Sequence, residues 1–257
     1  MITAAPTDAV RALAVRYFRR RARNQLAGIH IDGLDRLLPW NRAEGPTEPL
    51  IIVANHSSWW DAVMPILLSL EACDHDAYGV MEKRQLVRFG FFSRVGMFSI
   101  DRENPRSALR SIAYGADLLR NTGRVLWYYP QGEIIPNDRR PLIIARGAAR
   151  LVAAATPVTV IPVAFRYELL ANERPEVWVR VGESRRFSAD EGDGNLRDRC
   201  HHGIVDGLTE TLDSLRNDVV DGKTSGYRMI LSGRRSIDRW WDDVRGGSKA
   251  KGSDVTS

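Results

Sequence analysis

An abrupt change of composition near residue 55 constrains the fold more than any other feature. Residues 50–54 form an apolar run rich in Ile, which is typical of a buried strand. A polar turn with Asn55, His56 and two serines follows, and residues 62–70 are largely apolar again. This order predicts a strand, a turn and a helix. It places a histidine and a carboxylate at the carboxyl end of a strand, where open α/β sheets bind ligands.

His56 and Asp61 are the two side chains of this turn that can work as a pair. On one continuous helix their five-residue separation places them about 140° apart, so they could hardly touch. With His56 in the turn and Asp61 in the first helical turn, the carboxylate reaches the imidazole and fixes its tautomer. The other ring nitrogen can then take a proton from a hydroxyl that attacks an acyl group. A structural alternative stays open, because Ser58-x-x-Asp61 also matches a capping box.

Beyond this turn, strand-like and helix-like segments alternate. This pattern predicts a single α/β domain with a mixed, mostly parallel sheet flanked by helices. Further strands are expected at 77–81, 96–100, 125–129, 158–165 and 177–181, and helices at 104–123, 143–155 and 196–220.

Four positions carry more specific expectations. Pro65 requires its helix either to start late or to kink. Pro162 marks its strand as an edge strand or as the site of a bulge, because proline cannot donate to a ladder. Ile29 and Ile31 indicate a short edge strand. Residues 86–95 are expected to form an ordinary core helix, with the wall of an acyl-chain tunnel as the alternative.

Residues 7–27 are expected to form a basic amphipathic helix. One interpretation is an interfacial helix on anionic lipid, and the other is a helix packed on the domain with its arginines in solvent. The sequence favours neither. The apolar face of this helix consists of Val10, Leu13, Ala14 and Tyr17. Its arginines are Arg16, Arg19, Arg20, Arg21 and Arg23.

The composition limits the partners. The chain has 257 residues, a formal net charge of +5 and a pI of about 9.5, which favours anionic partners. A lipid surface is expected rather than nucleic acid, because aromatic residues are not interleaved with the basic ones. Two cysteines make no disulfide framework or metal site, and no run approaches the ~20 apolar residues of a membrane span. We therefore expect a cytoplasmic protein, which would be peripheral on the inner face of the cell membrane if its substrate is a lipid.

Five blocks of sequence carry a family resemblance. Asn55-His56-x-x-x-x-Asp61 resembles the first motif of the glycerolipid acyltransferase family, which includes lysophosphatidic acid acyltransferases. The other blocks follow in the family's order, and the resemblance covers about residues 45 to 185. They are 96–102, which ends in Arg102, Tyr129-Pro130-Gln131-Gly132-Glu133, Ala145-Arg146-Gly147, and 160–163.

The resemblance implies an O-acyltransferase that needs no metal and no cofactor. It would move a fatty acyl group from acyl-CoA or acyl carrier protein to a hydroxyl of a lysophospholipid or related lipid. His56 would be the general base and Asp61 would orient it, while backbone N–H groups of this turn or of Gly132 could stabilise the oxyanion. The implied substrate-binding residues are Asn55, Arg102, Gln131, Gly132, Glu133 and Arg146. The chain divides into an N-terminal helix and linker (1–48), an acyltransferase domain (49–245) and a disordered tail (246–257), with a last short helix around Trp240-Trp241.

The third block departs from the family pattern. Gln131 replaces the usual Glu, and Glu133 and Ile134 replace a Thr-Arg pair whose Arg helps to bind the acceptor's phosphate. Glu133 would repel a phosphate placed nearby. Acylation of an unphosphorylated glycosylated lipid, such as a glycolipid or a carotenoid glycoside, is therefore an alternative. A catalytically silent lipid-binding protein is another, and a hydrolase is a weaker one.

Overall fold

The computed structural model describes residues 1–189 and 195–234. A nine-stranded sheet in the order β4-β3-β5-β2-β6-β7-β1-β9 forms its centre, and β8 pairs with β6 beside this path. The strands are β1 (Gly28–Asp32), β2 (Leu50–Ala54), β3 (Ala77–Glu82), β4 (Met97–Ile100), β5 (Val125–Tyr128), β6 (Val158–Glu168), β7 (Glu176–Val181), β8 (Arg185–Phe187) and β9 (Arg228–Ser232). Most neighbours are parallel, and β6/β7, β6/β8 and β1/β9 are antiparallel.

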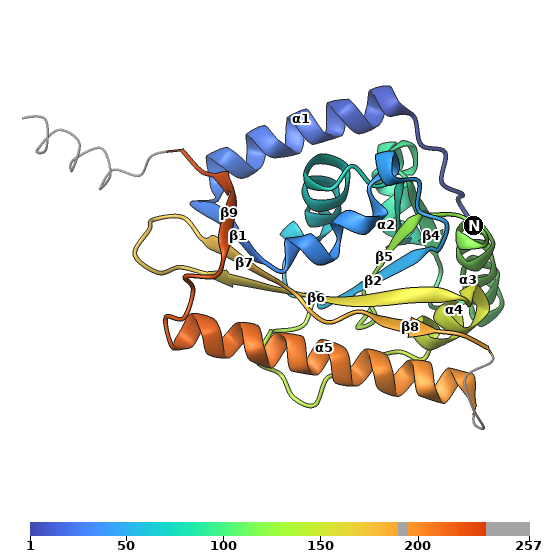
Figure 1. Cartoon of the computed structure of the whole chain (residues 1–257). Coiled ribbons are helices and arrows are strands. Elements are labelled where there is room, and N and C mark those ends of the chain that lie inside the picture. The colour runs from blue at the N-terminus through green and yellow to red at the C-terminus, as the bar shows by residue number, and fades with distance from the viewer. Residues whose placement is uncertain (190–194, 235–257) are drawn as a thin grey trace, which may run out of the picture.

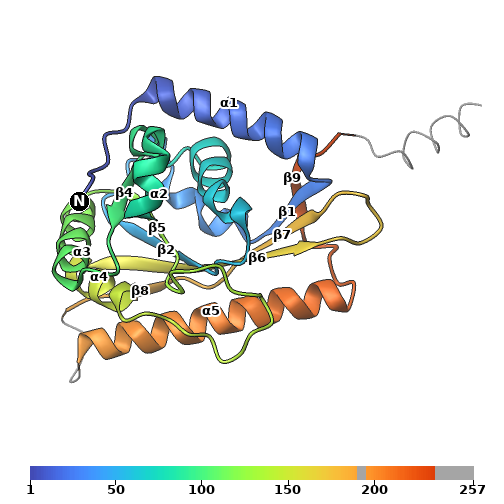
Figure 2. The same ribbon diagram turned by 180° about the vertical axis from the view of Figure 1, so that it is seen from behind.

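Helices cover both faces of the sheet (Figures 1 and 2). On one face lie α1 (Asp8–Gln25), α2 (Lys83–Arg88) and a π-helix, η5 (Ile66–Ala72). On the other face lie α3 (Pro105–Leu119), α4 (Gly147–Ala155) and α5 (Leu196–Val220). Short 3-10 helices occupy Leu34–Arg36, Leu38–Trp40, Arg42–Glu44, Trp59–Ala62 and Gly90–Arg94. The prediction of one α/β domain with a mixed, mostly parallel sheet is confirmed.

Strand β2 runs through the middle of the sheet, with β5 and β6 as parallel neighbours. All five of its residues are buried, because helices cover both of its sides. Its alternate side chains enter two separate cores, with Leu50 and Ile52 on the α1 side and Ile51 and Val53 on the α3 side. This explains why the sequence shows a continuous apolar run here instead of an alternation.

Two strands expected at an edge lie inside the sheet. Pro162 lies in the central strand β6, so the edge alternative was wrong, while the expected irregularity of the ladder is present. It falls where the neighbour of β6 changes from β8 to β7, and its carbonyl accepts from the N–H of Gly182 at 2.8 Å. The ladder is interrupted there, so the missing donor costs little. Ile29 and Ile31 lie in β1, which is internal because β9, a strand not expected from the sequence, covers its outer side.

Two helices end or begin in ways that the sequence only partly showed. Helix α3 starts as expected, with Asn104 accepting from the N–H of Ser107 and Pro105 in the first turn. It ends before Gly123, and Asn121 takes the left-handed conformation with φ of 56°. Pro65 precedes η5 directly, so the late start of that helix is confirmed.

Helix α1 packs against the sheet through Ala14, Phe18 and Ala22. Arg11 is buried beneath it, where its guanidinium donates to the carbonyls of Val95 and Ala77 at 3.0 and 2.8 Å. The boundary at residue 48 stays a prediction, although β1 before it pairs within the same sheet. The expected helix at Trp240-Trp241 and the expected tail at 246–257 lie outside the described residues.

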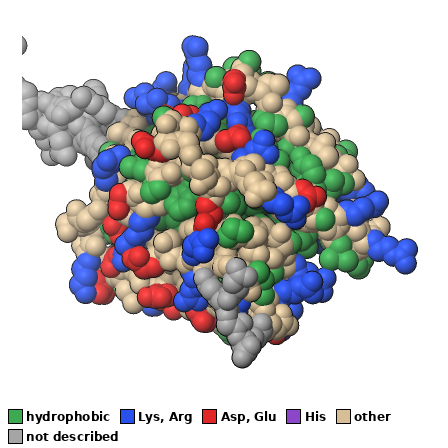
Figure 3. Space-filling model, turned by 45° about the vertical axis from the view of Figure 1, so that its right-hand side comes forward, with side chains coloured by type: hydrophobic (Ala, Val, Ile, Leu, Met, Phe, Trp, Pro, Cys, Tyr) green, Lys and Arg blue, Asp and Glu red, His purple; other side chains and the backbone are tan. Residues whose placement is uncertain are grey.

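Within the described ranges, no helix is long and apolar enough to cross a membrane. The face drawn in Figure 3 shows hydrophobic side chains in patches between Lys, Arg, Asp and Glu side chains.

Candidate active site

The carboxyl ends of three parallel strands bring the motif segments together. The turn with His56 follows β2, residues 129–133 follow β5, and Arg102 follows β4 by two residues. Strands β2 and β5 are direct neighbours, and β3 joins β5 to β4. Because parallel strands end at the same edge of a sheet, segments far apart in the sequence meet here, as the position of the first motif predicted.

His56 and Asp61 are in contact. The Nδ1 atom of His56 lies 2.9 Å from Oδ2 of Asp61, whose side chain is fully buried. The same carboxylate oxygen accepts from the backbone N–H groups of Ser57 and Ser58 at 2.6 and 2.8 Å. The capping box around Ser58 is also present. The two interpretations of Asp61 are therefore compatible, since one carboxylate caps the Trp59–Ala62 turn and holds the imidazole.

Two tyrosines complete the surroundings of Asp61. The hydroxyl of Tyr167 donates to Oδ1 of Asp61 at 2.6 Å, and that of Tyr129 donates to the backbone carbonyl of Asp61. Burial raises the pKa of both phenols, and the charge of Asp61 raises it further, so both stay protonated donors. The ring of Tyr129 also packs on His56, with centroids 4.9 Å apart.

Neither tyrosine was expected as a site residue from the sequence. Tyr129 stands in the third block, so its place beside the central turn could have been inferred. Tyr167 lies near the C-terminal end of β6, and no motif in the sequence marks it as a site residue.

Asn55 and Gln131 are bound within the protein. Asn55 is almost fully buried, and its side chain exchanges two hydrogen bonds with the backbone of Phe165, at 2.7 and 3.0 Å. It also donates to Asn137 at 2.7 Å. The side-chain oxygen of Gln131 accepts from the N–H of His56 at 2.7 Å. Both side chains therefore fix the turn, and their role in substrate binding stays a prediction.

Gly132 allows Arg102 to lie close to the third-block turn. Its φ is +75°, and a Cβ on it would stand 2.5 Å from Nη1 of Arg102. Arg102 is exposed and forms no hydrogen bond or ion pair with any described residue. Glu133 is exposed and does not line the pocket described next, although its neighbours Gly132 and Ile134 do. Arg146 is 71% exposed and pairs with Asp198 at 2.8 Å, away from that pocket.

A pocket of about 860 Å³ opens beside His56. Its walls come from α1, β3, the 83–94 segment, β4 and β5, and most of its lining is apolar. Phe89 and Phe91 are partly exposed to it, whereas Leu86 is buried in the core. The core helix expected over 86–95 was wrong, because α2 ends at Arg88 and a 3-10 helix occupies Gly90–Arg94. The alternative, the wall of an acyl-chain tunnel, stays a prediction. The lining includes Leu13, Tyr17, Trp59, Gly79, Met81, Phe92, Met97, Arg102, Trp127, Tyr129 and Gly132.

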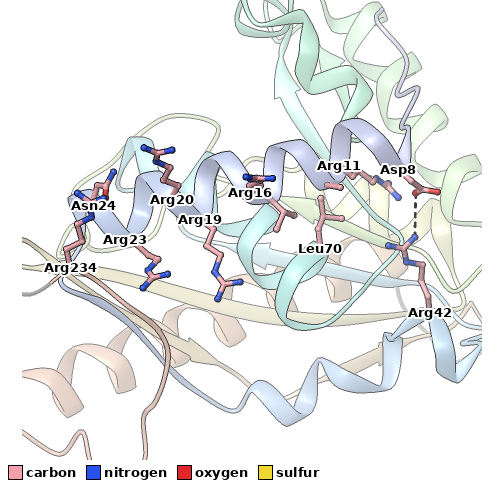
Figure 4. Close-up of a pocket in the computed structure, with 12 residues that line it drawn as sticks. Asp8, Arg11, Arg16, Arg19, Arg20, Arg23, Asn24, Arg42, Leu70 and Arg234 are labelled. Carbon is pink, nitrogen blue, oxygen red and sulfur yellow. Dashed lines mark ion pairs between the residues drawn. The ribbon is translucent and has the colours of Figure 1, made fainter.

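A second cleft, of about 770 Å³, lies on the other side of α1 and is lined by arginines (Figure 4). Arg19 pairs with Glu71 and Arg42 pairs with Asp74, both at 2.9 Å. In the close-up, Arg19 and Arg23 point to one side of α1, and Arg20 points to the other.

The expected oxyanion donors are already engaged. The N–H groups of His56, Ser57 and Ser58 are bonded as described, and that of Gly132 donates to the carbonyl of Tyr129 at 3.1 Å. In this conformation none of the four is available to a substrate. Among the described residues, no three His, Cys, Asp or Glu side chains gather as metal ligands.

Comparison with known proteins identifies the family. The acyltransferase family model matches residues 29–166, more than half of the 257-residue chain. The chain belongs to the acyltransferase family. The family match contains His56, Asp61, Arg102 and the 129–133 turn, whereas Tyr167 follows its last residue.

Two similar proteins put this acyltransferase in context. A 1-acyl-sn-glycerol-3-phosphate acyltransferase of Streptococcus pneumoniae is 33% identical over 122 residues, which is 46% of this chain and 42% of that protein. This chain thus matches less than half of its relative's length. The crystal structure of the 1-acyl-sn-glycerophosphate acyltransferase PlsC from Thermotoga maritima aligns with a TM-score of 0.48 at 16% identity, over 79% of this chain and 78% of that one.

Proposed function

We propose that this acyltransferase moves a fatty acyl group from an acyl thioester to a hydroxyl of a lipid acceptor. One observation carries the proposal: His56, bound through Nδ1 to a buried carboxylate, forms part of the wall of a large apolar pocket. The Nδ1–H tautomer leaves Nε2 with a lone pair, as a general base requires. An apolar pocket of this size suits a fatty acyl chain.

The reaction needs one base and no enzyme nucleophile. Nε2 of His56 takes the proton of the acceptor hydroxyl as its oxygen attacks the thioester carbon. Asp61 stabilises the imidazolium that forms. When the tetrahedral intermediate collapses, the C–S bond breaks and the imidazolium returns the proton to the leaving thiolate. The products are an ester and a free thiol of CoA or of acyl carrier protein. No cofactor or metal enters this balance.

The sequence leaves a phosphorylated and an unphosphorylated acceptor open, and the geometry favours the phosphorylated one. Arg102 lies beside Gly132 at the pocket and has no carboxylate partner among the described residues. A free guanidinium favours a phosphate. Glu133, the main reason to doubt a phosphate, is not part of the pocket lining. We therefore place a lysophospholipid first and a glycosylated lipid second.

The pocket rim supports work at a membrane surface. Leu13 and Tyr17 of α1 are 67% and 54% exposed, and Trp59 is 50% exposed. Arg21 lies over the Trp59 ring at this rim, with its guanidinium carbon 4.8 Å from the ring centroid, and the exposed Arg16 and Arg20 line the second cleft on the other side of α1. Apolar side chains next to a cationic stripe suit an anionic lipid surface. We propose that the rim contacts the inner face of the cell membrane, from which the lipid acceptor can enter.

The test is thiol release from palmitoyl-CoA with a panel of acceptors, using His56→Ala as the blank. The panel holds lysophosphatidic acid, a lysophospholipid with a larger head group, a monoacylated glycolipid, and no acceptor. Release that depends on His56 and on lysophosphatidic acid is the expected result. Release with the glycolipid alone would move the assignment to the second acceptor, and release without acceptor would make the protein a hydrolase. If no acceptor of the panel gives thiol release, palmitoyl-acyl carrier protein replaces palmitoyl-CoA as the donor. Lipid binding without turnover of either donor would contradict the proposed enzymatic function.

A further inference from the structure

The buried carboxylate of Asp61 needs more hydrogen-bond donors than His56 alone provides. Its side chain is 0% exposed, and burying an ionised carboxylate is unfavourable unless its oxygens are hydrogen-bonded. Oδ2 has three donors, which are His56 Nδ1 and the N–H groups of Ser57 and Ser58. Oδ1 has the Tyr167 hydroxyl at 2.6 Å, the one donor recorded for it among the described residues.

We propose that Tyr167 is a positioning residue of this active site, which holds the Asp61 carboxylate in the orientation that keeps His56 in its reactive tautomer. This inference rests on the proposed function. Tyr167 is absent from the pocket lining, so it acts through Asp61 and not on the substrate.

The geometry explains why a donor on Oδ1 matters. Rotation about the bond between Cβ and the carboxyl carbon of an aspartate is soft, so donors on one oxygen leave the plane of the carboxylate poorly fixed. A second donor on Oδ1 fixes that plane and therefore the direction from which Oδ2 accepts the Nδ1–H of His56. The pKa of the phenol lies well above its usual value, so Tyr167 donates throughout the working pH range.

Strand β6 places Tyr167 relative to the motif turn. The backbone of Phe165, two residues earlier on the same strand, holds the side chain of Asn55 through two hydrogen bonds. Side chains two apart on a strand point to the same face, so Phe165 and Tyr167 lie on the same side of β6. The strand thus binds the start of the motif through its backbone and the end of the motif through a phenol.

The test replaces Tyr167 with Phe and measures both turnover and the His56 tautomer. We expect kcat to fall about 10- to 100-fold, the loss expected for one hydrogen bond to a charged group. The KM for palmitoyl-CoA should change less than about twofold, because the pocket is intact. In ¹⁵N NMR of histidine-labelled protein, wild type should show His56 protonated at Nδ1, and Tyr167→Phe should show a mixture of tautomers.

Tyr227→Phe is the matched control. The Tyr227 hydroxyl also lies within hydrogen-bond distance of a carboxylate, at 2.9 Å from Asp218, but this pair joins α5 to the segment before β9 and has no contact with His56. The control should leave kcat and the His56 signals unchanged even if it lowers thermal stability. Equal losses of kcat in the two variants, or an unaltered His56 tautomer in Tyr167→Phe, would overturn the positioning role.

A second variant covers the case in which Tyr167→Phe does not fold. Incorporation of 3-fluorotyrosine at residue 167 keeps the shape and the donor, so kcat should stay within about threefold of wild type and the tautomer should be retained. Loss of the Nδ1–H signal in that variant would contradict the proposal. The NMR measurement needs no substrate, so it remains decisive about Tyr167 even if the acceptor panel fails to show acyl transfer.

Discussion

Gly132→Ala separates the backbone role of this glycine from its role beside Arg102. Gly132 has φ of +75°, where a residue with a Cβ is strained by roughly 1–2 kcal/mol. The new Cβ would also stand 2.5 Å from Nη1 of Arg102, too close for contact, so the guanidinium must move. Because that group is the end of a flexible side chain, its displacement adds little to the loss of stability. We expect Tm to fall by about 2–8 °C, at roughly 2–4 °C per kcal/mol for a chain of this size.

The kinetic effect should depend on the acceptor. If Arg102 binds the acceptor's phosphate, its displacement removes a charge-assisted hydrogen bond of about 1.5–3 kcal/mol, so kcat/KM for lysophosphatidic acid falls about 10- to 100-fold. An unphosphorylated monoacylglycerol should be affected less than about threefold. The assay is thiol release from palmitoyl-CoA at varied acceptor concentration.

Gly222→Ala is the control for this prediction. Gly222 has φ of +68°, and a Cβ there would meet nothing within 4 Å, so the substitution adds similar strain without a clash. It should lower Tm comparably and leave the kinetics unchanged. If Gly132→Ala and Gly222→Ala show the same kcat/KM for lysophosphatidic acid, the acceptor's phosphate does not bind at Arg102.

Three further predictions concern the pocket floor, a buried histidine and α1. A Cβ at Gly79 would stand 2.5 Å from Sδ of Met97, so Gly79→Ala should push the Met97 thioether into the pocket. The shorter pocket should raise the rate with octanoyl-CoA relative to the rate with palmitoyl-CoA. An unchanged ratio of the two rates would mean that the acyl chain binds elsewhere. Burial lowers the pKa of His75, so below about pH 6.5 the unfolded chain binds more protons than the folded protein. The contribution of His75 to stability should therefore be complete above about pH 6.5 and should be lost as the pH falls through the folded-state pKa. His75→Gln should flatten this decline in urea unfolding between pH 7 and pH 5, and an equally steep decline would exclude His75 as its source. The double variant Arg16→Gln/Arg20→Gln should sediment less with phosphatidylglycerol vesicles than wild type does. The control Arg110→Gln/Arg150→Gln, which removes two other exposed arginines, should sediment as wild type does. Equal reductions in vesicle binding would show only an effect of net charge.

The sequence could predict the centre of the sheet because local signals there agree with the tertiary structure. The apolar run 50–54 is buried on both sides, and the turn after it lies at the strand end where the His56–Asp61 contact forms. The position of Pro162 could not be predicted, because the interruption it tolerates depends on β7 and β8, which pair with β6 from elsewhere in the chain. The internal position of β1 was missed for the same reason, since β9 reaches it from the C-terminal side.

The candidate site was predictable where residues are close in sequence and not where they are distant. Arg102 and Gly132 each belong to a recognisable block, but their close approach depends on packing between two turns. Arg146 was expected at the site because of its place in a block, yet it pairs with Asp198 on α5. Tyr167 was missed because a tyrosine on a β-strand is ordinary, and only the folded chain brings it within 2.6 Å of Asp61.

In the proposed mechanism His56, oriented by Asp61, removes the proton from the acceptor hydroxyl. The most direct measurement is the rate of ester formation from palmitoyl-CoA and the accepted lipid, followed by mass spectrometry, in wild type, His56→Ala and Asp61→Asn, with circular dichroism to confirm folding. Both variants should lose about 10³-fold or more in kcat, with KM for palmitoyl-CoA within about twofold of wild type. A folded His56→Ala protein that forms ester at a tenth of the wild-type rate or faster would contradict it.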